Sequence, residues 1–160
     1  MVATSIVVWS AATTALAKDD PNAADPNAAD LARMQGDWMV ATMQTEGMEV
    51  PAEEAQALFR TVENDTYTVS RYAKVASRGT FQIDATKSPK TIDSTPAAVG
   101  AAAPPADGKA KPPQTIRGIY EFDGDKLRIC NARPGQPRPK NFEAKQYTGH
   151  TLIVWEPEVK

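Results

Sequence analysis

The stretch RGIYEFDGDKLRICNA, residues 117–132, decides the fold class of this chain. Apolar and polar residues alternate on both sides of the dipeptide Asp123-Gly124. Such alternation is typical of strands with one buried face, and an Asp-Gly dipeptide between two such runs is a strong signal for a tight turn. The stretch therefore predicts a β-hairpin.

Two pairing registers are possible for this hairpin. A two-residue loop pairs Glu121 with Lys126, whereas a four-residue loop pairs Glu121 with Arg128. In both registers opposite charges share one face. The other face carries the apolar residues Tyr120, Phe122, Leu127 and Ile129. The register is left open, but the fold class does not depend on it.

Similar β-type segments recur along the chain, and one segment is helical. We expect strands at residues 37–44, 59–63, 66–72, 79–84, 91–93, 116–122, 126–132 and 151–155. One short helix is expected at 51–58, because Pro51 suits the first helical position and two glutamates follow in the first turn. A short helical lead-in is expected at 31–36. The pattern predicts an all-β, mainly antiparallel sheet that is closed or nearly closed, since closure removes exposed edges.

The N-terminal residues resemble a targeting segment. Residues 2–17 carry no charge and end in Ala15-Leu16-Ala17, directly before Lys18. This pattern is typical of a secretory signal peptide, so we expect residues 1–17 to be a signal peptide and the protein to be exported (periplasmic or secreted). An N-terminal anchor and a cytosolic location are the alternatives. The run is shorter than the ~20 apolar residues that span a bilayer, so no integral membrane span is expected.

Two further segments have the composition of unstructured sequence. Residues 18–30 contain PNAAD twice in tandem, which predicts a flexible linker. Residues 96–114 are mostly Ala, Pro, Gly and Lys without periodicity, which predicts a disordered insert between two strands. We therefore expect a single folded domain at 31–160 that carries this insert.

Several motifs in order resemble those of a known family. They are GDW at 36–38, IDATKSPKTID at 83–93, the 117–132 stretch, PGQPRPKNF at 134–142 and GHTLIVWE at 149–156. Together they resemble a family of small planctomycete proteins of uncharacterised function, and the resemblance covers residues 31–156. It implies a small lipocalin-like up-and-down β-barrel in an exported bacterial protein. It implies no catalytic residues, because no activity is established for the family.

The sequence carries few signs of catalysis. Cys130 is the only cysteine, in an apolar β segment, and is expected to be a small buried hydrophobe. His150 is the only histidine, which excludes a metal site with two histidines, and it is expected to cap or fill the turn before the last strand. A thiol enzyme would need these two residues to meet in space. No G-x-S-x-G, phosphate-loop or dinucleotide motif is present. We expect no enzyme activity, no cofactor and no metal.

Binding is the function class that the sequence favours. A small barrel can hold one ligand in its mouth or lumen, and the candidate ligand-binding residues are Trp38, Tyr67, Arg71, Arg117 and Tyr120. In the alternative reading, these arginines lie outside and the aromatic residues fill a dry core. The net charge of -2, with no basic block, speaks against nucleic-acid binding. A group of basic residues suits either an anionic partner or a soluble surface: Lys87, Lys90, Arg133, Arg138 and Lys140.

The expected function is therefore that of an exported, non-enzymatic protein that binds a small molecule or an envelope component. The alternative is a structural or interaction module with a solid core, whose loops contact a protein or polysaccharide. A cavity with a few polar groups favours the first, and an exposed apolar patch favours the second.

Overall fold

The computed structural model describes residues 25–97 and 114–159. Within these ranges the elements are α1 (Pro26–Met34), β1 (Gly36–Thr45), β2 (Met48–Glu49), α2 (Ala52–Ala55), β3 (Leu58–Glu63), β4 (Thr66–Arg71), β5 (Lys74–Asp84), β6 (Lys90–Pro96), β7 (Ile116–Asp123), β8 (Lys126–Asn131) and β9 (Thr151–Pro157). The expected signal peptide, and most of the expected insert at 96–114, lie outside the described residues.

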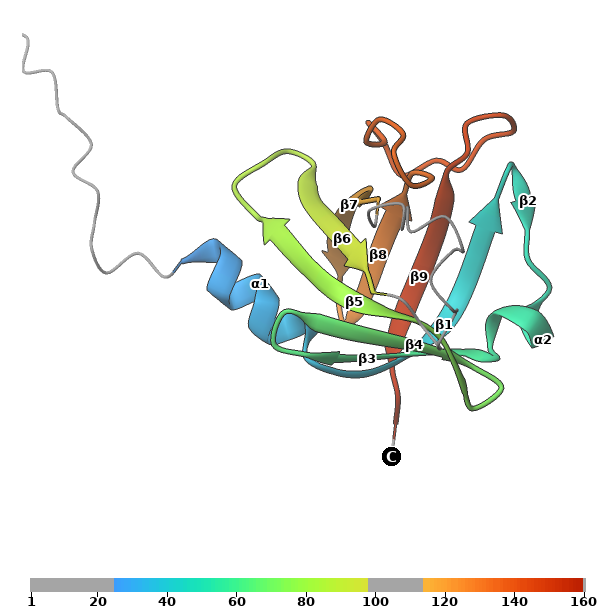
Figure 1. Cartoon of the computed structure of the whole chain (residues 1–160), viewed down its shortest axis with the longest axis horizontal. Helices are drawn as coiled ribbons and strands as arrows, with labels where there is room; N and C mark the ends of the chain where they lie inside the picture. Colours follow the sequence, from blue (N-terminus) through green and yellow to red (C-terminus); the bar gives the residue numbers. More distant parts are fainter. Residues whose placement is uncertain (1–24, 98–113, 160) are drawn as a thin grey trace, which may run out of the picture.

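The strands form one antiparallel sheet that closes on itself. Their order is β2-β1-β3-β4-β5-β6-β7-β8-β9, and β1 also pairs with β9. Because β2 is a short extension paired to β1, the other eight strands make the barrel. Strands that follow one another in the chain are neighbours in the sheet, as in an up-and-down barrel (Figure 1). The prediction of a small lipocalin-like all-β barrel is confirmed.

Strand β1 closes the barrel because it is long enough to serve two neighbours. Residues 36–39 pair with β3, and residues 38–45 pair with β9. The ladder with β9 shifts register between Val40 and Thr42. A bulge of this kind bends the strand and increases its twist, which lets one strand curve from one partner to the other.

The connections between strands alternate between the two ends of the barrel, because successive strands run in opposite directions. The turns β3–β4, β5–β6 and β7–β8 lie at the end where β1 begins, which we call the α1 end. The connections β1–β3, β4–β5 and β8–β9 lie at the opposite end, where β6 ends and β7 begins, and we call it the mouth end. At the mouth end, the amide of Gly47 donates to the carbonyl of Ala144 and joins the first of these connections to the last.

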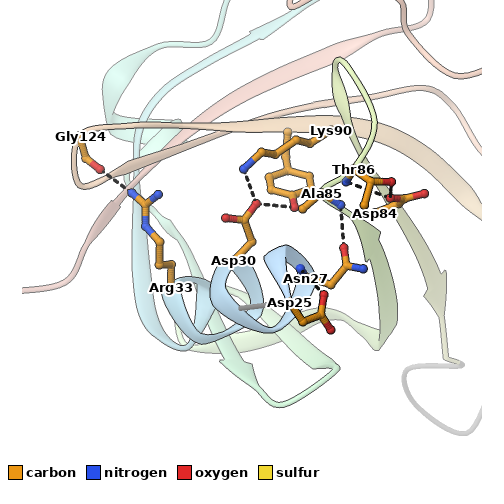
Figure 2. A network of polar contacts seen from close by, with 10 residues as sticks. Asp25, Asn27, Asp30, Arg33, Asp84, Ala85, Thr86, Lys90 and Gly124 are labelled. Atoms are coloured by element: carbon orange, nitrogen blue, oxygen red, sulfur yellow. Dashed lines mark hydrogen bonds and ion pairs between the residues drawn. The ribbon is translucent and has the colours of Figure 1, made fainter. Parts of the chain in front are cut away.

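Helix α1 and the residue that follows it are hydrogen-bonded to all three turns at this end of the barrel. Arg33 Nη2 donates to the Gly124 carbonyl over 2.9 Å, and the Ala85 amide donates to Asn27 Oδ1 over 2.7 Å (Figure 2). Just after the helix, Gln35 Oε1 accepts a 2.6 Å hydrogen bond from the β3–β4 turn. The helix therefore covers this end of the barrel.

The flexible linker predicted for residues 18–30 is wrong for its last part, because residues 26–30 belong to α1. The Asp25 carboxylate caps the helix by accepting from an amide in the first turn, and Pro26 occupies the first turn. Leu31 and Met34 pack against the barrel core. So short a helix is marginal in isolation; docking onto the barrel stabilises it.

The helix predicted at 51–58 is shorter in the structure. The described residues contain two helices: the helical lead-in expected at 31–36 corresponds to the end of α1, and α2 has only four residues. Strand β3 already begins at Leu58, which pairs with Arg71 of β4. Leu58, which the local pattern assigned to the end of the helix, therefore belongs to the sheet.

The predicted hairpin is present as β7 and β8. Glu121 pairs with Arg128, which is the second of the two registers, and the ladder continues to the pair Asp123–Lys126. The turn itself is therefore two residues long, and its Gly124 has a φ of +63°, a backbone conformation that glycine adopts without steric cost. Strands β5 and β6 extend beyond the predicted ranges 79–84 and 91–93.

Two apolar clusters stabilise the fold. The larger one fills the lumen and draws on both helices and all eight barrel strands; its buried members are Met34, Trp38, Val40, Ala55, Val62, Tyr67, Phe81, Ile92, Tyr120, Leu127, Ile129 and Trp155. The smaller one contains Ile119, Cys130, Ala144 and Leu152, with Phe142 packed against it. It buries residues of β7–β9 beneath the connection between β8 and β9. The predicted burial of Cys130 is confirmed.

Candidate functional site in the barrel lumen

The predicted aromatic site residues lie in the lumen. Trp38, Tyr67 and Tyr120 are all buried members of the larger core cluster. Trp38 Nε1 donates to the Met34 carbonyl over 2.9 Å, and the Tyr120 hydroxyl donates to Asp30 Oδ2 over 2.8 Å. Both bonds tie the barrel to α1, so the polar atoms of these two residues are already engaged in the structure.

The buried position of Tyr120 also affects its ionisation. Removal from water and its hydrogen bond to Asp30 raise the pKa of the phenol above its usual value. The same carboxylate accepts from Lys90 Nζ over 2.6 Å (Figure 2). The lysine and the aspartate neutralise each other at the α1 end of the barrel.

The two predicted arginines are not brought into the lumen. Arg71, at the end of β4, is exposed and forms a 3.4 Å ion pair with Glu54. Arg117 is exposed on the outer side of β7. The structure thus separates the predicted aromatic residues from the predicted cations.

A different arginine occupies the lumen. Arg60 of β3 is only 6 % exposed. Its guanidinium carbon lies 5.3 Å from the ring centroid of Tyr67, 5.6 Å from that of Phe81 and 6.0 Å from that of Trp155. Contacts of a guanidinium with aromatic faces at such distances are favourable cation–π interactions. We call these four residues the Arg60 cage.

Polar atoms within the Arg60 cage lack hydrogen-bond partners. Nε and Nη2 of Arg60 and Nε1 of Trp155 are all buried, and none has a partner among the described residues. Burial lowers the pKa of Arg60 to about 10, so the side chain still carries its charge at neutral pH. Burying a cation without an acceptor costs free energy, and a buried group perturbed in this way is a candidate functional residue.

A hollow of about 440 Å³ lies at strands β4, β5 and β6. Most of its lining residues, such as Thr66, Arg78 and Thr95, belong to the outward alternation of these strands, whereas Tyr67, Gly79 and Pro96 belong to the inward one. Tyr67 is common to the hollow and to the Arg60 cage. The volume lies in the range of small-molecule sites in proteins.

Apolar side chains toward the mouth end are only partly buried. Leu58 lies two residues from Arg60 on β3, and Val69 is the ladder partner of Arg60 on β4. Both pack against the larger core cluster yet keep partial exposure, as do Met43 and Ile153. The Arg60 cage is therefore continuous with accessible apolar surface at the mouth end.

The alternation of β3 was the signal that sequence reasoning missed. In LFRTVE the buried or half-buried residues are Leu58, Arg60 and Val62, and Phe59 is 38 % exposed. Hydrophobicity alone does not identify the inner face here, because apolar residues occur in both alternations. Val62 pairs with Tyr67, which points into the lumen, so Val62, Arg60 and Leu58 face the lumen as well.

A second hollow lies outside the barrel. It measures about 810 Å³ and is lined in part by Lys87, Arg138 and Lys140. Arg138 forms an ion pair with Asp93, and Lys87 one with Asp84. Of the remaining predicted basic residues, Arg133 pairs with Glu46 and Lys90 with Asp30, while Lys140 has no ion pair with the described residues. Most of the predicted basic group is therefore neutralised within the protein.

Cys130 and His150 approach the same backbone carbonyl. Cys130 Sγ lies 3.9 Å and His150 Nδ1 lies 3.3 Å from the oxygen of Glu143. The thiol is fully buried, and burial raises its pKa to about 11. A nucleophilic cysteine needs a lowered pKa and access to substrate, so this arrangement argues against a thiol catalyst.

Residues 25–97 and 114–159 contain no cluster of three or more histidine, cysteine, aspartate or glutamate side chains placed to hold a metal ion. Nor does any helix in these ranges have the length and apolar character needed to cross a membrane.

The fold and the site define a small closed antiparallel β-barrel with a buried, aromatic-caged arginine. Comparison with family models, with curated proteins and with solved structures finds no match for this chain.

Proposed function

We propose that this chain is a non-enzymatic binding protein that holds a small molecule in its barrel. The observation that carries the proposal is the Arg60 cage, in which three buried nitrogen atoms have no partner among the described residues. Mostly apolar sites with a few polar groups are the usual form of a small-molecule site. The half-buried apolar residues toward the mouth end supply the apolar part of such a site.

We further propose that the protein acts after export, in the periplasm or outside the cell, and belongs to the small planctomycete family that it resembles. Residues 1–17, with their uncharged run and Ala-Leu-Ala end, support export. A small closed barrel is also the fold that the resemblance to this family implies. In this setting the ligand is a small molecule or an envelope component.

A second candidate function is that of an interaction module that binds another envelope component through its mouth-end connections. Three large apolar side chains of these connections are highly exposed, namely Met48 at 67 %, Tyr72 at 67 % and Tyr147 at 89 %. Exposed aromatic residues are enriched at protein interfaces. This function requires no ligand in the lumen.

Native mass spectrometry of the protein purified from the envelope of its own organism separates these two functions. The binding protein is expected to carry an additional small mass that is lost when the same sample is denatured. A bare polypeptide mass in repeated native preparations would contradict the proposal and favour the interaction module. A chain that begins near Lys18 would support export in either case.

A further inference from the structure

The lumen contains one charge that the protein does not neutralise. Lys90 and Asp30 pair with each other at the α1 end. Arg60 has no ion pair with any carboxylate of the described residues, although it is 6 % exposed. The interior therefore has an excess of one positive charge, located in the Arg60 cage.

The unpaired nitrogen atoms of Arg60 have the arrangement that a carboxylate requires. Nε and Nη2 are the two buried donors without a partner among the described residues. Their N–H bonds lie along the same edge of the planar guanidinium and point in parallel directions, so two oxygens of one anionic group can accept both. Trp155 Nε1 is a third unpaired donor on a ring of the same cage.

The surroundings of this edge are apolar and aromatic. Tyr67, Phe81 and Trp155 enclose the guanidinium, and Leu58 and Val69 lead from it toward the mouth end. A charge-assisted hydrogen bond is strengthened where water is excluded. A molecule that fits both features has an anionic headgroup and an apolar body.

We propose that the ligand of the barrel is an amphiphilic anion of this kind, such as an apolar monocarboxylate, and that Arg60 binds its headgroup with help from Trp155. This inference rests on the proposed binding function and specifies its ligand class. The headgroup occupies the Arg60 cage, and the apolar body follows the half-buried side chains toward the mouth end.

The test compares two probes of the same length that differ in charge, dodecanoate and dodecanol, by calorimetric titration of the full chain at neutral pH. The wild-type protein is expected to bind dodecanoate about 10- to 100-fold more tightly than dodecanol, as expected for hydrogen bonds to a charged group. Arg60→Met is expected to remove this preference while dodecanol binding persists. Arg117→Met, which removes an exposed arginine from the same barrel, is the matched control and is expected to keep the full preference.

A third variant covers the case in which Arg60→Met does not fold. Arg60→Lys keeps the charge but loses the two parallel donors, so it is expected to prefer dodecanoate by a smaller factor than the wild type. Cooperative unfolding by circular dichroism checks that each variant is folded.

The outcomes separate this inference from the proposed function. Equal binding of the two probes to the wild type would overturn the anionic ligand class and leave the binding function standing. A full preference in a folded Arg60→Met or an unreduced one in Arg60→Lys would overturn the role of Arg60. If neither probe bound at all, the ligand class would be wrong, and a bare mass in native mass spectrometry would then decide against the binding function itself.

Discussion

Replacing Trp38 with alanine is expected to lower the free energy of unfolding by about 3–5 kcal/mol, the range for deletion of a large aromatic side chain from a packed core. Trp38 is 4 % exposed, and its Nε1 donates to the Met34 carbonyl over 2.9 Å. The substitution removes both core volume and the link between β1 and α1. Urea unfolding followed by far-ultraviolet circular dichroism measures the change, since this signal does not depend on the tryptophan.

Two matched substitutions make this result interpretable. Trp38→Phe keeps most of the ring and loses the N–H donor, so a smaller loss of about 1–2 kcal/mol is expected. Met48→Ala removes an apolar side chain that is 67 % exposed, and a change within about 0.5 kcal/mol is expected. A loss below about 1 kcal/mol for Trp38→Ala would mean that α1 and this part of the barrel are not packed as described.

Replacing Asp30 with alanine is expected to cost about 2 kcal/mol. The change leaves the buried Tyr120 hydroxyl without its acceptor, and an unsatisfied buried group costs about 1–3 kcal/mol. Lys90 also loses its 2.6 Å partner, but its side chain is 37 % exposed, so water replaces much of that interaction. Equilibrium urea unfolding measures the loss, and faster amide exchange in α1 reports on the docking of the helix.

The double variant Asp30→Ala with Tyr120→Phe tests the stated cause. Removing the hydroxyl together with its acceptor is expected to recover part of the stability lost in Asp30→Ala. Asp123→Ala serves as the control because Asp123 is exposed and forms no ion pair with the described residues. If the double variant were less stable than Asp30→Ala by the full cost of Tyr120→Phe alone, the two groups would not be coupled.

The sheet was predictable because its signals are local. The alternation around Gly124 and the β-branched and aromatic residues of β4 identify strands without reference to any partner. The choice between the two hairpin registers needs the pairing of β8 with β9, which places Leu127 opposite Trp155 in the lumen. Register therefore follows from the closed barrel and not from the hairpin alone.

The first part of helix α1 was not predicted, because residues 26–30 have little apolar character of their own, whereas the helical lead-in expected at 31–36 corresponds to its end. The second copy of the repeat does carry a start signal, with Asp25 as the cap and Pro26 after it. Leu31 and Met34, three residues apart, then form the docking face. The cap signal together with this apolar spacing identifies the helix, whereas composition alone predicts a linker.

The candidate site was predictable only in part. Both interpretations of the aromatic residues of β1, β4 and β7, as the lining of a pocket or as a dry core, place them inside the barrel, and the structure has them in the core. The arginines were chosen because they share strands with apolar residues, but Arg117 alternates with inward residues and lies outside. Arg60 was missed because burying a cation opposes its hydration, and only the ladder between β3 and β4 places it inside.

The central claim is that a small molecule binds beside Arg60 inside the barrel, and its most direct test is a titration of the isotope-labelled protein with dodecanoate, followed by amide chemical shifts. The largest changes are expected at Leu58, Arg60, Tyr67 and Val69, which belong to the cage and to the route toward the mouth end. Changes confined to residues of the outer hollow, such as Asp93 and Arg138, would contradict the claim.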